Sequence, residues 1–406
     1  MSARVNHDAG STRRGIWLAT LLWLAVFLLP AQLSATSQSD RPTGRQVLTA
    51  GWVLRPDGTL GKNLAVVLGG GRIERVVPVG RVRREDARDF GPQAVIAPGL
   101  VDLFSSLGAA RALRETAELV DPDASPLWAL DPLHPDFRLA LRAGVTAAVV
   151  APEPVNLVSG VCVTVRTHTG GASLDVLRDN GPLVFAFGEG VWRPERAPTS
   201  RAGMVHEFGK LVAEARKGLG PERVRAALAG QLDAVVVCPS AVDVTAVRGV
   251  LGGRFRRFGL VHSQDIVELV DLLKQMRRPV VVGPYGFSSS RRELLGAAAL
   301  ADAGVEVAFC GGLPELPAAG LRITAALAVR QGMNPAAARR AMTINPARVG
   351  GVASRVGAVA AAKEADLVVF SRDPLRLDAR VLEVYVRGKR VFAAQAAAAG
   401  PEGGAP

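Results

Sequence analysis

The chain has 406 residues, of which 49% are hydrophobic and 21% are charged. This balance excludes a largely disordered or fibrous protein, and the presence of a single long apolar segment excludes a multi-span transporter. The net charge is +12, but the basic residues are mostly arginines that are scattered or in small groups. They have no recognition motif or interleaved aromatic residues, so we expect no nucleic-acid partner. Cys162, Cys238 and Cys310 are too few for a disulfide framework, and none belongs to a Cys-x-x-Cys zinc motif.

Residues 1–40 are predicted to be a signal peptide followed by a linker. Arg13 and Arg14 precede the apolar run Ile16–Leu29, and small residues such as Ala35 follow it. A helix of this run would span about 21 Å, which is shorter than the hydrocarbon core of about 30 Å. We therefore expect cleavage near Ala35, export to the periplasm or the medium, and no stable membrane span. A membrane-anchored form is the alternative.

Residues 46–97 are predicted to be β structure. The short apolar runs Val47–Leu54 and Leu64–Leu68 are separated by turn signals such as Asp57-Gly58. The triplet Gly69-Gly70-Gly71 is interpreted as the tip of a hairpin, because Ile73–Val77 after it has the pattern of a strand and not of a helix.

Residues 98–350 alternate short apolar runs with segments of helical periodicity, which predicts a (β/α)₈ TIM barrel. The predicted helices include Phe137–Ala143, Val205–Ala215, Asp265–Met276 and Arg291–Ala303. The eight predicted barrel strands are Gly99–Phe104, Val145–Ala151, Val161–Arg166, Leu183–Phe187, Ala234–Cys238, Phe258–His262, Pro279–Gly283 and Val305–Cys310.

The β pattern returns in residues 351–392. Asp366–Phe370 and Leu382–Val386 are predicted strands, and a turn at Arg387-Gly388-Lys389 leads into Arg390–Phe392. A β segment on each side of the barrel predicts a small composite β-sandwich, with residues 46–97 as its first half and residues 351–392 as its second. The Ala/Gly/Pro-rich residues 393–406 are expected to be a disordered tail.

Five segments, in the expected order, resemble motifs of the amidohydrolase superfamily. They are Ala97–Asp102, Ala143–Thr146, Thr343–Arg348, Lys363–Phe370 and Val384–Val391. The resemblance is to imidazolonepropionase-like and cyclic-amide hydrolases, and it implies the same barrel and composite sandwich. It also implies hydrolysis of carbon–nitrogen bonds other than peptide bonds by one or two metal ions, which lower the pKa of a bound water to about 7.

The same resemblance implies that the metal site is degenerate. The two histidines that end the first barrel strand are replaced by Phe104 and Ser106, and the histidine of the fifth strand falls at Val237. Gly312 stands where the last strand should supply an aspartate. Only His262, at the end of the sixth predicted strand, matches a ligand position of the family. We therefore expect no metal and no other cofactor.

Two alternatives stay open for this face of the barrel. His168, Cys238 and Cys310 follow or end predicted strands, so they are candidate pocket residues, and with His262 they could rebuild a zinc site. In the second alternative, His262 and the cysteines bind no metal and only support the structure of the barrel. Asp102 and Glu315 are the best-placed carboxylates, and a buried structural acceptor is the simpler interpretation of Asp102.

The sequence therefore predicts an exported protein of the amidohydrolase family without metal-dependent hydrolysis, either a pseudoenzyme or a binding scaffold. The alternative is a hydrolase acting on carbon–nitrogen bonds with a reduced or rebuilt metal site, so enzymatic activity is left open. An apolar pocket around Phe104 would suit an uncharged small molecule. The sequence does not predict the oligomeric state.

Overall fold

The computed structural model describes residues 44–109, 112–251, 258–261 and 264–395. Residues 41–406 form one compact unit by their contacts. The predicted signal peptide and most of the predicted tail lie outside the described residues, so export stays a prediction. No helix in the described part of the chain is long and apolar enough to cross a membrane.

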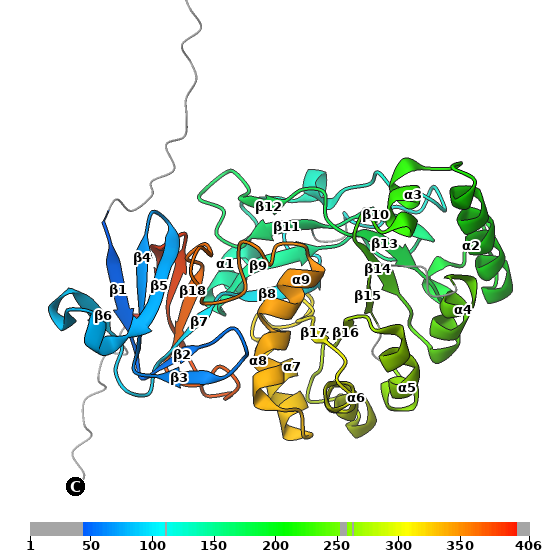
Figure 1. Ribbon diagram of the computed structural model, residues 1–406. Helices are drawn as coiled ribbons and strands as arrows, with labels where there is room; N and C mark the ends of the chain where they lie inside the picture. The colour runs from blue at the N-terminus through cyan, green and yellow to red at the C-terminus, as the bar shows by residue number, and fades with distance from the viewer. Residues whose placement is uncertain (1–43, 110–111, 252–257, 262–263, 396–406) are drawn as a thin grey trace, which may run out of the picture. The chain divides into compact units, whose positions relative to one another are not determined.

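Strands from both ends of the chain form two β-sheets (Figure 1). The first sheet has the order β5-β4-β1-β6, with β1 Gln46–Thr49, β4 Leu64–Gly69, β5 Arg72–Pro78 and β6 Ala87–Asp89. The second sheet has the order β20-β19-β18-β7-β2-β3, with β2 Trp52–Leu54, β3 Leu60–Lys62, β7 Val95–Pro98, β18 Leu367–Phe370, β19 Val381–Val386 and β20 Lys389–Ala393. Short 3-10 turns at Val79–Arg81 and Arg84–Asp86 connect β5 to β6.

The second sheet combines segments that precede and follow the central part of the chain. Strand β7 pairs antiparallel with β18, so Val95 lies opposite Phe370. Leu48 and Val66 of the first sheet and Ile96 and Leu367 of the second are buried in one cluster, which is the arrangement of two sheets packed face to face.

The predicted hairpin at the glycine triplet is confirmed. Strands β4 and β5 pair antiparallel, with Gly69 opposite Arg72. Gly70 and Gly71 have φ angles of +57° and +79°, a backbone region that glycine adopts without a steric cost.

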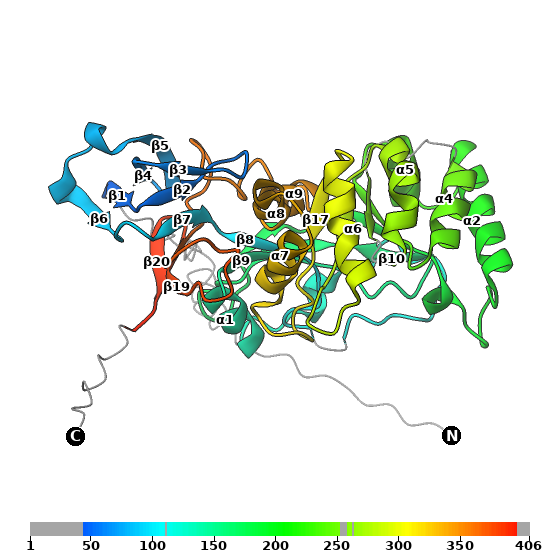
Figure 2. The same ribbon diagram turned by 90° about the horizontal axis from the view of Figure 1, so that it is seen from below.

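The central part of the chain has an α/β arrangement. Its strands are β8 Leu100–Ser105, β9 Val145–Val150, β10 Val158–Val161, β11 Val163–Arg166, β12 Val176–Arg178, β13 Leu183–Ala186, β14 Ala234–Val237, β15 Phe258–Val261, β16 Val280–Val282 and β17 Val307–Phe309. Its helices are α1 Pro135–Arg142, α2 Arg201–Arg216, α3 Glu222–Ala229, α4 Ala241–Leu251, α5 Ile266–Met276, α6 Arg291–Asp302, α7 Gly320–Arg330, α8 Pro335–Ala341 and α9 Ile344–Val349, with 3-10 turns at Pro126–Ala129 and Glu189–Val191. Helices α2, α4, α5 and α6 lie next to one another at the end of the central part away from the two sheets described above (Figure 2).

Seven of the eight predicted barrel strands run parallel, but the third does not. Strands β13 to β17 form one parallel ladder, and β8 pairs parallel with β9. The predicted strand Val161–Arg166 corresponds to β10 and β11, which pair antiparallel with β13 and β9 respectively. The prediction of a parallel third strand is therefore wrong. Strands β10 and β11 run in the direction opposite to β9 and β13.

The two sheets of the central part meet at β8 and β17 without a continuous ladder among the described residues. Hydrogen bonds still connect them, because the Ser106 amide donates to the Leu313 carbonyl oxygen at 3.1 Å. The fold is thus mixed α/β, and among the described residues its central part has two sheets that no backbone ladder joins at either end.

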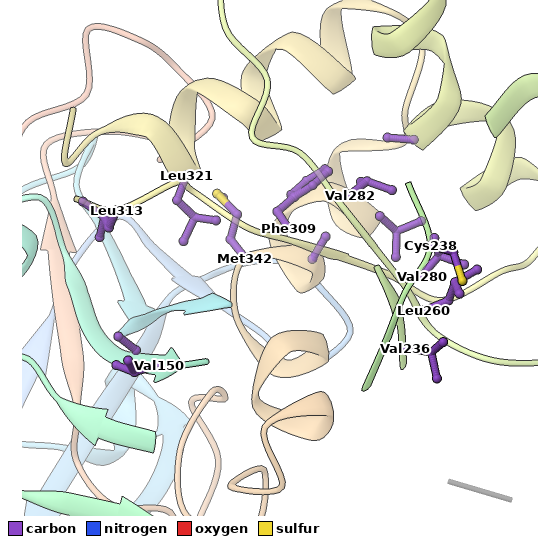
Figure 3. Packing of buried hydrophobic residues seen from close by; sticks show 14 of the residues in the cluster. Val150, Val236, Cys238, Leu260, Val280, Val282, Phe309, Leu313, Leu321 and Met342 are labelled. Carbon is purple, nitrogen blue, oxygen red and sulfur yellow. The ribbon is translucent and has the colours of Figure 1, made fainter. Parts of the chain in front are cut away.

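Side chains on alternate positions of these strands enter two separate apolar clusters. The outer cluster includes helix residues such as Phe208 and Leu273, and Figure 3 shows its strand residues Val236, Leu260 and Val280 beside one another. The inner cluster contains side chains from the opposite strand faces: Val101, Leu103, Ala147, Val149, Val184, Val235, Val281, Ala308 and Cys310. This alternation follows from the two-residue period of a β-strand.

A buried arginine links β11 to the β-sandwich. The side chain of Arg166 is fully buried and donates from Nε to Asp366 Oδ2 at 2.7 Å and from Nη1 to Asp175 Oδ1 at 3.0 Å. Its Nη2 is paired with Glu364, which Arg355 also contacts at 2.6 Å. All three guanidinium nitrogens are therefore satisfied by carboxylates, as the burial of a charge requires.

Candidate functional site

A cavity of about 590 Å³ opens at the carboxyl ends of β8 and β9. This edge of the strands is where functional residues collect in an α/β barrel. The cavity is lined by Phe104, Ser105, Ser106, Leu113, Arg114, Ala151, Pro152, Glu153, Pro154 and Glu315. Two predicted site positions, Phe104 and Ser106, and the predicted carboxylate Glu315 thus share one cavity.

Phe104 lies in this cavity with a strained backbone. Its φ angle is +55°, and the pairing of β8 with β9 shifts register between Leu103 and Ser105, which makes Phe104 the extra residue of a bulge. A bulky residue rarely adopts this left-handed conformation, which costs about 1–3 kcal/mol. The half-buried Phe104 side chain packs against the inner cluster, and this packing offsets the strain.

Polar pairs surround the phenylalanine. The Ser106 hydroxyl donates to Glu315 Oε1 at 2.7 Å, and this bond joins the end of β8 to the loop after β17. Arg114 forms an ion pair with Glu153, which joins the loops after β8 and β9. The lining is therefore mixed, and the expectation of a predominantly apolar cavity is not met.

Val237 and Cys238 lie on opposite faces of the same strand end. Val237 packs against the inner cluster together with Phe104 and Val261. Cys238 is fully buried in the outer cluster, where Figure 3 shows it beside Leu260 and Val280. Burial raises the pKa of the Cys238 thiol well above its usual range, so it stays protonated and is a poor ligand.

Cys310 and Gly312 end the last strand in different surroundings. Cys310 belongs to the inner cluster, and burial raises the pKa of its thiol, with the nearby Asp102 carboxylate acting in the same direction. Gly312 has a φ of +72°, and a Cβ atom there would come within 2.9 Å of Pro284 Cγ. Both the backbone and the space at this position exclude a larger side chain without rearrangement.

His168 lies at the opposite edge of the strands, which corrects its prediction as a pocket residue. It follows β11, whose last residue Arg166 pairs with Ala147 near the start of β9, because β11 runs antiparallel. Burial lowers the pKa of His168, and Asp175 and Lys389 are its charged neighbours. His262 lies outside the described residues. The described parts of the predicted rebuilt zinc site, His168, Cys238 and Cys310, therefore do not converge.

Asp102 is a fully buried carboxylate on β8. Its Oδ1 accepts a hydrogen bond from the Gly311 amide at 2.5 Å, while its Oδ2 has no partner. Burial raises the pKa of Asp102 to about 7, against the opposing effect of the amide hydrogen bonds from the segment after β17. Asp102 thus fits the interpretation as a structural acceptor, which holds the seam between β8 and β17.

Comparison with known proteins relates one segment of the chain to a family and its fold to solved structures. Residues 262–391 match the model of the amidohydrolase family. An amidohydrolase from Thermotoga maritima MSB8 has the same fold, with a TM-score of 0.76 and 22% identity over 86% of this chain and all of that chain. The family match covers about a third of this chain, and with the shared fold it supports an assignment to the amidohydrolase superfamily.

Two other solved structures are less similar in fold. Molinate hydrolase has a TM-score of 0.56 and 16% identity, with 86% of this chain and 95% of that chain covered. A zinc-bound adenosine deaminase from Xanthomonas campestris has a TM-score of 0.51 and 19% identity, over 86% of this chain and 93% of that chain. At these identities the likeness shows the shared fold.

One curated relative matches along the sequence. Amidohydrolase tasK of Hapsidospora irregularis is 22% identical over 355 residues, which are 73% of this chain. The match covers 36% of that protein, so the chain spans about a third of the length of the relative.

The superfamily usually binds metal, but the described residues at the expected positions do not fit a metal ion. Phe104 and Val237 offer no donor atom, and Gly312 offers no side chain. Among the described residues, no group of three or more His, Cys, Asp and Glu side chains could hold a metal. Zinc in proteins takes nitrogen, sulfur and carboxylate ligands, and three protein ligands are usual at a catalytic site.

Two charged residues of the cavity, Arg114 and Glu153, were not predicted from the sequence. Both lie in loops that follow predicted strands, so their position in the chain was the available signal. Their pairing across two loops depends on the fold and could not be predicted from local patterns.

Proposed function

We propose that this chain is a member of the amidohydrolase superfamily that does not carry out metal-dependent hydrolysis, and that it binds a small molecule in the cavity at Phe104. The observation that carries the proposal is the packing of Phe104 and Val237 against the inner cluster. At the positions where the family resemblance implies metal-binding imidazoles, this chain has apolar contacts.

The backbone at Phe104 supports a retained binding role. Strained residues persist where the surrounding structure determines them, and they collect at ligand-binding and catalytic sites. A φ of +55° at a cavity-lining phenylalanine is such a case. The ring presents an aromatic surface on which the flat part of a ligand can pack.

The size and lining of the cavity are suited to a small molecule. About 590 Å³ falls within the range of about 300–1,000 Å³ that is typical of ligand pockets. Phe104 and Leu113 supply apolar surface, and the ion pair of Arg114 with Glu153 supplies charge at the same opening. We expected an uncharged ligand from the sequence, but this lining favours a ligand that has both apolar and polar parts.

Export belongs to this proposal because of the N-terminal segment. Arg13, Arg14 and the apolar run Ile16–Leu29 have the order of a secretory signal. The ligand would then be met outside the cytoplasm.

The alternative is hydrolysis of carbon–nitrogen bonds by a reduced site that retains His262. An assay of the purified protein with hydantoin, imidazolone and N-acyl amino acid substrates separates the two functions. We expect no product above the uncatalysed rate, and the same result for the His262→Ala variant. Turnover by the wild-type protein that is lost in His262→Ala would establish the hydrolase and overturn the proposal.

A further inference from the structure

Two arginines in the loop after β13 have buried donors without acceptors. Nη2 of Arg193 and both Nε and Nη2 of Arg196 are buried from solvent and lack any hydrogen-bond partner. Neither side chain has an ion pair among the described residues. A buried, unpaired guanidinium edge is costly, because it loses its hydration without gaining a protein acceptor.

The two guanidinium groups are close enough to repel each other. Burial lowers the pKa of Arg196, and the charge of Arg193 lowers it further, while Glu118 opposes this shift. The indole Nε1 of Trp192, in the same loop, is also a buried donor without a partner. The loop thus gathers positive charge and donors, and although Glu118 acts on Arg196, no carboxylate of the described residues is bonded to these three donor groups.

The position of Arg196 is set by the neighbouring loop. Its Nη1 donates to Asn156 Oδ1 at 3.0 Å, and Asn156 is held in turn because its Nδ2 donates to the Glu115 carbonyl oxygen at 2.9 Å. This contact leaves the Nε–Nη2 edge of Arg196 free, which is the edge that binds both oxygens of a carboxylate in a planar pair.

The loop that carries the arginines approaches the cavity, although neither arginine is among its lining residues. Asn156 follows Pro152, Glu153 and Pro154, which line the cavity after β9. A Cβ atom on Gly190, in the loop that leads to Arg193, would come within 3.6 Å of the Pro154 carbonyl oxygen. Gly190 in the loop after β13 therefore lies close to Pro154 of the cavity wall.

From these contacts we propose that Arg193 and Arg196 form a subsite for the carboxylate group of a small molecule bound at the cavity. The inference depends on the proposed function only for the presence of such a ligand. The cavity also contains the acidic residues Glu153 and Glu315, which would repel a doubly charged phosphate more strongly than a singly charged carboxylate. The ligand is then a carboxylic acid with an apolar or amide body, and the expectation of an uncharged ligand is replaced.

The test compares N-acetylglycine with its uncharged analogue N-acetylglycinamide by isothermal titration calorimetry, at constant ionic strength. We expect binding of N-acetylglycine, at least tenfold weaker binding of the amide, and at least a tenfold loss of N-acetylglycine affinity in Arg196→Met and Arg193→Met. Arg196→Lys keeps the charge but lacks the two-donor edge, so it should also bind weakly. The matched control is Arg216→Met, on the exposed end of α2, which should bind as the wild type does.

The unliganded variants provide a second readout. Because Arg196→Met removes unpaired buried donors, its thermal unfolding midpoint should equal or exceed that of the wild type, whereas the loss of a structural arginine would lower it. Equal binding of acid and amide, unchanged binding in Arg196→Met, or tighter binding of inorganic phosphate than of N-acetylglycine would each overturn the subsite. Release of glycine from N-acetylglycine would contradict the proposed function and leave the subsite standing.

Discussion

The buried carboxylate of Asp102 predicts a specific dependence of stability on pH. Its pKa is about 7 in the folded protein and near 3.8 in the unfolded chain, so the folded state binds more protons between these two values. The free energy of unfolding should therefore fall as the pH rises through this window. Replacement by asparagine keeps an oxygen that can accept from Gly311 and removes the titration.

The size of the effect follows from the two pKa values. A difference of about 3 pKa units corresponds to about 4 kcal/mol in total, of which about 3 kcal/mol is expressed between pH 5 and pH 8. Since Asp102 is fully buried, solvent does not screen this difference. Between pH 5 and pH 8, the free energy of unfolding of Asp102→Asn should therefore rise by about 3 kcal/mol relative to that of the wild type.

Urea denaturation at several pH values measures this gain. Asp179→Asn, which changes an exposed carboxylate, is the matched control and should follow the wild-type curve. Parallel curves for Asp102→Asn and the wild type from pH 5 to pH 8 would refute the assignment of Asp102 as a carboxylate that is protonated near neutrality.

Two further predictions concern the buried ion pairs and the end of the last strand. Arg166→Met leaves the buried Asp366 without its guanidinium partner, while Glu364 keeps Arg355. The free energy of unfolding should therefore fall by about 3–5 kcal/mol in denaturation experiments, while Arg216→Met should change little. A loss below about 1 kcal/mol would contradict the structural role of Arg166. Gly312→Asp adds a side chain at a φ of +72°, with its Cβ within 2.9 Å of Pro284. It should lower the thermal midpoint more than the control Gly70→Asp, because Gly70 has a φ of +57° and open space around it. An equal fall of the midpoint in both variants would show that Gly312 can accept the family's aspartate.

Strand positions could be predicted from the sequence because each strand is a short apolar run bounded by turn residues. The direction of the third predicted strand could not be predicted. Strands β11 and β13 are buried on both faces, and the sequence of such an apolar run does not indicate whether it is parallel or antiparallel. This error also misplaced His168, because the end of an antiparallel strand lies at the opposite edge.

The candidate site was partly predictable from the alternation of side chains along β14. Counting from Val237, which packs inward, places Cys238 outward, so the position of Cys238 in the outer cluster follows from the strand period. The unpaired donors of Arg193 and Arg196 had no local signal. Whether these donors find an acceptor depends on which loops the fold brings together.

The metal content of the purified protein tests the central claim most directly. Elemental analysis of the protein, with the zinc-bound adenosine deaminase from Xanthomonas campestris as a positive control, should find less than one tenth of an equivalent of zinc, manganese or iron per chain, because Phe104, Val237 and Gly312 supply no ligand. One tightly bound equivalent of a transition metal per chain would contradict the proposal of a non-hydrolytic member of the superfamily.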